Sequence, residues 1–258
     1  MDGSATVLVL KLFGTPAVVG AATLAGRRYG PTVTGWLGGL PLASGPLTYF
    51  LTVEQGARFG AASATATLAG LVGVAAFVVG FSRMSTAGGW PVPVATGLSA
   101  FLVIAAVMLF VPLPAPAAFV AALVALTLGI WLMGSPQARV APRPAPPWDI
   151  PARASLATAM VVGLSAIAST LGARLVGLIA PFPVYASVMA SFTHAQDGPA
   201  ASMRLLRGVL VGCYGFACFY LSVALLATTS VLWAFLIATV AALAVNGTSI
   251  WVLRRLRW

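Results

Sequence analysis

The hydrophobic residues of this chain fall into nine long runs, separated by short breaks rich in glycine, proline or arginine. The runs cover roughly 4–26, 31–54, 59–82, 89–111, 117–134, 152–171, 174–195, 200–227 and 230–253. A helix of about 20 residues crosses a hydrocarbon layer about 30 Å thick. Each run is therefore predicted to be a membrane-spanning α-helix. The proline-rich stretch 135–150 is predicted to be the one long loop, an extended linker.

Composition agrees with this pattern. Of the 258 residues, 60% are hydrophobic and 7% are charged, and the mean hydropathy is +1.01. Soluble domains carry about 25% charged residues. The chain is thus predicted to be an all-α, polytopic membrane protein, since its runs lack the short polar–apolar alternation of a β-barrel.

A pattern of glycine, proline and phenylalanine occurs twice, 142 positions apart. The first copy consists of Gly30, Gly35, Pro41, Phe50, Gly56, Gly70, Gly73 and Phe77. The second consists of Gly172, Gly177, Pro183, Phe192, Gly198, Gly212, Gly215 and Phe219. Aligned at this offset, 30–83 and 172–225 share 10 identities in 54 positions.

The duplication predicts two four-helix repeats, residues 1–114 and 151–258, joined by a linker of helix 5 and a cytoplasmic loop over 115–150. An odd linking helix turns the second repeat upside down, so the repeats are predicted to be inverted, as in many transporters.

The second helix of each repeat carries proline and glycine near mid-depth, around Pro41 and Pro183. Proline removes a backbone donor and kinks or opens a helix, and opened backbone in a membrane must face protein or a wet cavity. The two breaks are predicted to meet near the midplane and bind a solute; the alternative is two kinked helices packed without a ligand. The candidate substrate-binding residues are Gly38, Gly39, Pro41, Ser44, Pro181, Pro183, Tyr185 and Lys11.

Basic residues gather on one predicted face of the membrane. The richer face carries eleven of them: Arg27, Arg28, Arg83, Arg139, Arg143, Arg153, Arg204, Arg207, Arg254, Arg255 and Arg257. The other carries Lys11, Arg58 and Arg174. The positive-inside rule predicts the richer face to be cytoplasmic, with the N-terminus outside and the C-terminus inside. Lys11 and Arg153, which align between the repeats, are expected to snorkel to headgroups, or Lys11 to attract an anion.

Three ionisable groups are candidates for proton coupling: Glu54, His194 and Asp197. Glu54 and Asp197 end the second and seventh helices, where a carboxylate at a membrane entrance can exchange protons. His194 lies one turn before Asp197. The alternatives are helix-end acids paired with arginine and a structural histidine. Asp149 is expected to be solvated in the linker.

The segment Gly177–Pro183, with His194 and Arg207–Gly212 after it, resembles the small four-helix GlpM-like membrane proteins. These have a Gly-Leu-Ile-x-x-Phe-Pro segment in their second helix and a histidine about a dozen residues later. The resemblance covers roughly 160–226, with a fainter echo over 17–82. It implies a fused, inverted pair of such units and carries no site residues, because the role of that family is poorly defined.

The sequence favours a secondary transporter of the cytoplasmic (inner) membrane that moves a small anionic or lipid-linked solute by alternating access. The alternative is a non-transporting membrane subunit or scaffold that assists envelope biosynthesis. No catalytic, metal or cofactor motif is present, Cys213 and Cys218 are expected to be free thiols, and an enzyme is not expected. Membrane lipids are the expected partners, nucleic acid is not, and a homo-oligomer or a membrane-protein partner is left open.

Overall fold

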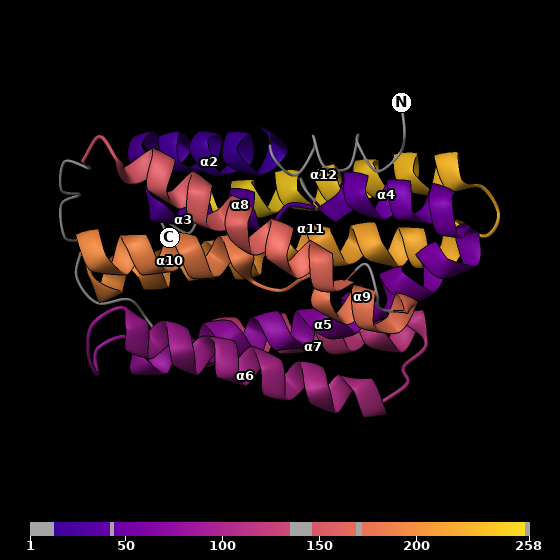
Figure 1. The fold of residues 1–258 in the computed structure, drawn as a ribbon, viewed down its shortest axis with the longest axis horizontal. Coiled ribbons are helices and arrows are strands. Elements are labelled where there is room, and N and C mark those ends of the chain that lie inside the picture. Colours follow the sequence, from indigo (N-terminus) through magenta and orange to yellow (C-terminus); the bar gives the residue numbers. More distant parts are fainter. Residues whose placement is uncertain (1–12, 42–43, 135–145, 169–171, 256–258) are drawn as a thin grey trace.

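The computed structural model describes residues 13–41, 44–134, 146–168 and 172–255. These residues are 86% helical and contain no strand. The helices are α2 (Thr15–Tyr29), α3 (Pro31–Gly38), α4 (Ser44–Gln55), α5 (Ala57–Met84), α6 (Pro91–Phe110), α7 (Ala115–Leu132), α8 (Asp149–Ala168), α9 (Ala173–Ile179), α10 (Val184–Asp197), α11 (Pro199–Leu226) and α12 (Val231–Arg255) (Figure 1). The all-α prediction is confirmed for this part of the chain.

The predicted count of nine spans is not supported. Six described helical segments are long and apolar enough to cross a membrane, with α9 and α10 counted as one segment, Ala173–Asp197. The predicted runs 4–26, 31–54 and 152–171 are not in this set, and each contains residues outside the described part of the chain. The α8 helix begins at Asp149, three residues earlier than predicted. The protein is thus a multi-pass membrane protein with six clear candidate spans in its described residues.

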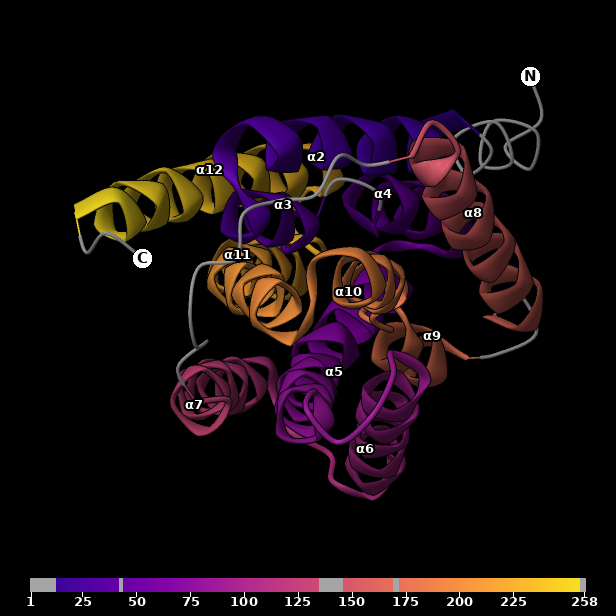
Figure 2. The same cartoon turned by 90° about the vertical axis from the view of Figure 1, so that its left-hand side faces the viewer.

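Two helices of 28 residues each, α5 and α11, form the centre of the molecule. They pack against each other, with α6 beside α5, α12 beside α11, and α7 in contact with both. Viewed end-on, α6, α7, α8 and α12 lie at the outside (Figure 2). In its most apolar window, α5 is 72% buried, whereas α6 is 17% buried. Apolar helices that expose most of their surface are typical of a lipid-facing periphery.

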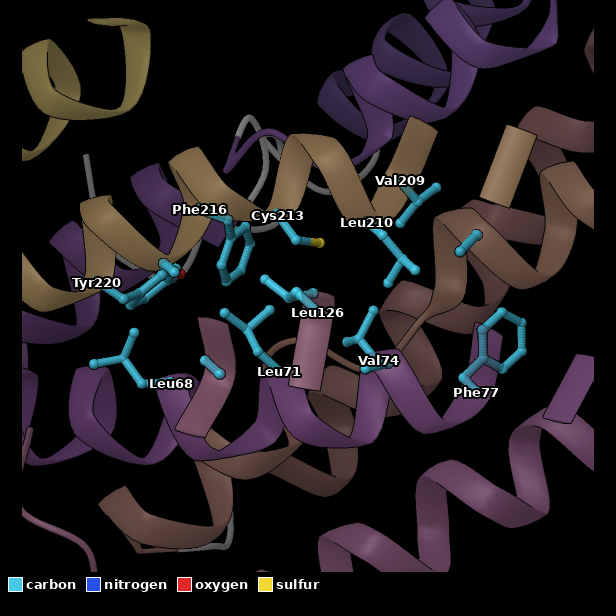
Figure 3. Close-up of a cluster of buried hydrophobic side chains, with 14 of the residues drawn as sticks. Leu68, Leu71, Val74, Phe77, Leu126, Val209, Leu210, Cys213, Phe216 and Tyr220 are labelled. Atoms are coloured by element: carbon cyan, nitrogen blue, oxygen red, sulfur yellow. The ribbon is translucent and has the colours of Figure 1, made fainter. Parts of the chain in front are cut away.

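The interface between α5 and α11 is a packed apolar core. Figure 3 shows its side chains: Leu68, Leu71, Val74 and Phe77 from α5, Leu126 from α7, and Val209, Leu210, Cys213, Phe216 and Tyr220 from α11. Cys213 is buried here and Cys218 is half-buried, and both are free thiols, as predicted. The two long helices are therefore joined by side-chain packing along their central turns.

Sharp reversals before α5 and α11 occur at equivalent glycines. Gly56 has φ 94° between α4 and α5, and Gly198 has φ 85° between α10 and α11. Positive φ is accessible to glycine at little cost, whereas a side chain disfavours it. These two positions of the repeated pattern thus have the same backbone role in both halves.

The predicted interruptions in the second and seventh helices are confirmed. The α3 helix ends at Gly38 and α4 begins at Ser44, whereas α9 ends at Ile179 and α10 begins at Val184. After each break, the carbonyl of the repeated proline accepts a hydrogen bond from the first turn of the next helix. The Gly45 N–H donates to the Pro41 carbonyl at 2.9 Å, and the Ser187 N–H donates to the Pro183 carbonyl at 2.7 Å.

Candidate functional site

Each interrupted helix packs against a long helix distant in sequence. On α3, a side chain at Gly35 would overlap the backbone carbonyl of Leu205 on α11. On α9, a side chain at Gly177 would overlap the backbone carbonyl of Ser63 on α5. Glycine permits this close approach of two helix backbones, as at small-residue interfaces in membranes.

The breaks themselves are packed in the same manner. A Cβ on Gly39 would lie 2.7 Å from the Cα of Gly212 on α11. A Cβ on Gly70 of α5 would lie 2.6 Å from Pro181 Cγ and 2.9 Å from the Leu178 carbonyl oxygen. Gly39 and Pro181 are two of the predicted solute-binding residues. In the structure, Gly39 packs against Gly212 of α11, and Pro181 packs against Gly70 of α5.

Tyr185 connects the two interrupted helices. Its hydroxyl donates a 2.8 Å hydrogen bond to the Thr34 carbonyl on α3, and its ring fills the space beside Gly38, where a side chain would overlap it. The start of α10 therefore meets α3 directly. Among the predicted substrate-binding residues, Gly38 and Tyr185 are thus brought together.

The other predicted binding residues are placed less centrally. Pro183 is buried at the start of α10, and Pro41 and Ser44 are half-buried at the α3–α4 break. The Ser44 carbonyl accepts a 2.8 Å bond from the Thr48 hydroxyl, within α4. Lys11 lies outside the described residues.

The three proton-coupling candidates do not form one group. Glu54 is exposed near the end of α4, and Asp197 is half-buried at the end of α10. Figure 1 places the ends of these helices at opposite ends of the molecule. His194 is buried, and its Nε2 donates to the Ser85 carbonyl at 2.7 Å, because a carbonyl oxygen only accepts. This bond between α10 and the α5–α6 connection gives His194 a structural contact.

A charged cluster that the sequence did not predict lies where α2, α8 and α10 meet. Asp149, at the start of α8, is 1% exposed, and Arg153, one turn later, is 4% exposed. Arg153 Nε lies 2.7 Å from Asp149 Oδ1, and Arg27 Nη2 of α2 lies 3.2 Å from Asp149 Oδ2. The predictions that Asp149 is solvated and that Arg153 snorkels to headgroups are therefore wrong.

Residues of α10 complete the cluster. Gln196 Nε2 donates to Asp149 Oδ1 at 2.7 Å, and its Oε1 accepts from Arg153 Nη2 at 3.1 Å. The Arg153 guanidinium also lies 5.0 Å above the ring of Phe192. A buried ion pair is tolerated only when such additional bonds compensate for lost hydration.

Opposing effects act on the Asp149 carboxyl, which precedes the apolar part of α8. Burial raises its pKa, but the hydrogen bonds from Arg153, Gln196 and Arg27 and the charge of Arg153 lower it, and the net direction is downward. Asp149 is consequently ionised at neutral pH and holds two arginines.

A local signal could have identified this cluster. Asp149 is followed by Pro151, and an acid just before proline is typical of a helix start. Asp149 and Arg153 are also spaced i, i+4, the spacing of paired side chains on one helix face. The prolines on the N-terminal side of Trp148 concealed the signal, because they favoured an extended linker.

Within the described residues, no group of three or more His, Cys, Asp or Glu side chains is arranged to hold a metal ion. Comparison of the chain with known proteins gives no match to a family model, a curated protein or a solved structure.

Proposed function

We propose that this protein is a secondary transporter of the cytoplasmic membrane, built from two inverted halves that rock against each other. The observation that carries the proposal is a set of reciprocal contacts. Gly35 packs on the backbone of Leu205, and Gly177 packs on that of Ser63. The two glycines are 142 positions apart, and so are their partners Ser63 and Leu205, so each repeat contacts the other through equivalent residues. Gly212 beside the Trp36 carbonyl and Gly70 beside the Leu178 carbonyl form a second such set.

Reciprocal contacts of this kind are what a two-fold axis produces. The direction of the helices supports an axis in the membrane plane, because α5 and α11 run in opposite directions in Figure 1, as do α6 and α12. Inverted halves with interrupted second helices are a frequent design of secondary transporters. The proposal therefore assigns α2–α6 to one half and α8–α12 to the other, with α7 as the link.

Nine membrane crossings follow from this assignment if α3–α4 and α9–α10 each cross once as a broken helix. The combined segment Ala173–Asp197 is long and apolar enough to cross a membrane, which supports its crossing. Nine crossings place the termini on opposite sides. The arginines at the ends of α2 and α5 and in the first turns of α11 support a cytoplasmic location for that end of the molecule.

The proposed solute site lies between the α3–α4 and α9–α10 breaks, bounded by Gly38, Tyr185, Ser44 and Pro183. The N-terminal ends of α4 and α10 begin in these breaks, and helix N-termini favour negative charge. We accordingly favour a small anionic or lipid-linked solute. Movement of one half would carry its interrupted helix along the glycine-lined surface of the opposite long helix.

The charged cluster fits the role of a gate at the cytoplasmic end. Arg27 belongs to one proposed half, whereas Asp149, Arg153 and Gln196 belong to the other. If the Arg27 contact opens, Asp149 keeps Arg153 and Gln196, and Arg27, already 43% exposed, enters water. The contact can therefore break without leaving an unpaired buried charge.

Cysteine accessibility tests this function without knowledge of the solute. Ser44→Cys and its equivalent Ala186→Cys are placed singly in a chain whose Cys213 and Cys218 are replaced by Ala. Each is treated with the membrane-impermeant thiol reagent MTSET in right-side-out and in inside-out vesicles. Alternating access predicts that each cysteine reacts from both faces; reaction from one face only, or from neither, contradicts it.

One observation favours the alternative, a packed membrane subunit that does not transport. The described contacts at Gly38, Gly39 and Pro181 are close backbone or ring contacts of the kind that exclude a ligand. If the protein is such a subunit, we expect that neither cysteine reacts with MTSET. We also expect a stoichiometric membrane-protein partner in a detergent pull-down.

A further inference from the structure

Asn246 is a buried amide in the apolar helix α12. Its side chain is 1% exposed, and among the described residues neither Nδ2 nor Oδ1 has a hydrogen-bond partner. It lies within the candidate span Val231–Ser249 and against Gly215 of α11, where a side chain would overlap the amide. A buried amide is unfavourable unless a group bonds to it.

Neighbours of the amide, one helical turn away on α11 and α12, contact α3. Ser249, one turn after Asn246, accepts a 3.0 Å hydrogen bond from Trp36 Nε1 on α3. Gly212, one turn before Gly215 on α11, contacts the Trp36 carbonyl and Gly39. Asn246 therefore lies between α11 and α12, one helical turn from the contacts that both helices make with the end of α3.

The other half has no polar group in the corresponding place. Gly73 of α5 is the equivalent of Gly215, and it packs against the ring of Phe101 on α6. Phe101 is 1% exposed and packs edge-on against Phe182, with ring centroids 5.2 Å apart. An apolar ring fills the space at Gly73, so packing against the equivalent Gly215 does not require an amide. The presence of a polar residue at 246 therefore has a reason other than helix packing.

We propose that Asn246 is a solute-binding residue that hydrogen-bonds a hydroxyl group of the carried solute; this inference rests on the proposed transport function. The amide presents one donor group and one acceptor, and a hydroxyl group can satisfy both. A cation would bond the oxygen alone, and a carboxylate the nitrogen alone. The solute is thus expected to carry a hydroxyl-bearing portion, such as a glycerol or sugar unit.

The first test compares Asn246→Cys with the matched control Ala242→Cys, one turn earlier on α12 and also buried. Both are made in the chain without Cys213 and Cys218, and MTSET is the probe. We expect Asn246→Cys to react at least tenfold faster than the control. Equal, slow reaction of the two overturns the proposal. If Ser44→Cys still reacts from both faces in that case, the transport function stands and only this site is rejected.

The second test measures the melting temperature of Asn246→Leu in detergent. Removing an amide that has no partner in the protein should leave the temperature unchanged or raise it by about 2–4 °C. A fall of several degrees overturns the proposal, because the amide would then have a structural partner or a structural water. Ser249→Ala is the control, and its melting temperature should fall because Trp36 loses its hydrogen-bond acceptor.

Discussion

Arg27 on α2 and Asp149 at the start of α8 are joined by an ion pair of 3.2 Å across 122 residues of sequence. The same carboxylate is held by Arg153 of its own helix at 2.7 Å. Arg27 is 43% exposed, whereas Arg153 is buried. The two arginines therefore have different roles: Arg153 compensates the buried charge, and Arg27 connects α8 to α2.

Replacing Arg27 should affect stability little. Arg27 is itself 43% exposed, and Asp149 keeps Arg153 and Gln196 when Arg27 is replaced, so we expect Arg27→Gln to lower the free energy of unfolding by about 1 kcal/mol or less. Arg28→Gln is the control, since Arg28 is the adjacent residue, is exposed and lies over the Tyr29 ring. If Arg27 is a gate, its replacement should also increase MTSET labelling of Ser44→Cys from the cytoplasmic face. An unchanged labelling rate would exclude a gating role.

Replacing Arg153 should be far more damaging. Removing one partner of a buried ion pair typically costs about 3–5 kcal/mol, because the other charge remains buried. Arg153→Met should therefore unfold at much lower temperature than the wild type. The double variant Arg153→Met with Asp149→Leu should recover most of the loss, because both charges are absent. Equal instability of the single and double variants in thermal unfolding would show that the charge itself is not the cause.

The close backbone contacts predict strong effects of a single methyl group. Gly35→Ala and Gly177→Ala should each destabilise the protein by about 1–3 kcal/mol, because the added Cβ overlaps a backbone carbonyl of the facing helix. Gly163→Ala is the control, since nothing lies within 4 Å of that position on α8. It should be neutral or slightly stabilising, as alanine favours helix. Similar effects at all three sites would contradict the described packing.

His194 should act through its hydrogen bond to Ser85. His194→Phe leaves that carbonyl without its donor, which should cost about 1–3 kcal/mol. His194→Gln has an amide donor at a similar reach and should retain part of the stability. Thermal unfolding of both variants at pH 7.5 checks this; a fully stable His194→Phe would show that the bond contributes nothing.

The lengths of the hydrophobic runs were sufficient to predict an all-helical membrane protein, and the positions of proline and glycine were sufficient to predict the two interruptions. Proline and glycine define the breaks at Pro41 and Pro183 locally, since their effects act within one helical turn. Six of the nine predicted spans are found among the described residues, and the other three runs, 4–26, 31–54 and 152–171, each extend into residues outside that part of the chain.

The charged cluster escaped prediction for a different reason. Arg27, Asp149 and Gln196 come from three separate segments, and only tertiary packing brings them together. The contact between Asn246 and Gly215 is likewise set by how α11 and α12 face each other. Sequence pattern identifies which residues are unusual in a membrane, but it does not give their neighbours.

The central claim is that the two halves are inverted, and the sidedness of two equivalent loops tests it most directly. Ala87, between α5 and α6, and Thr229, between α11 and α12, are both exposed and are 142 residues apart. As single cysteines in the chain lacking Cys213 and Cys218, they are labelled in sealed vesicles of known orientation. We predict that Ala87→Cys reacts only from the cytoplasmic face and Thr229→Cys only from the opposite face. Labelling of both from the same face would contradict the account.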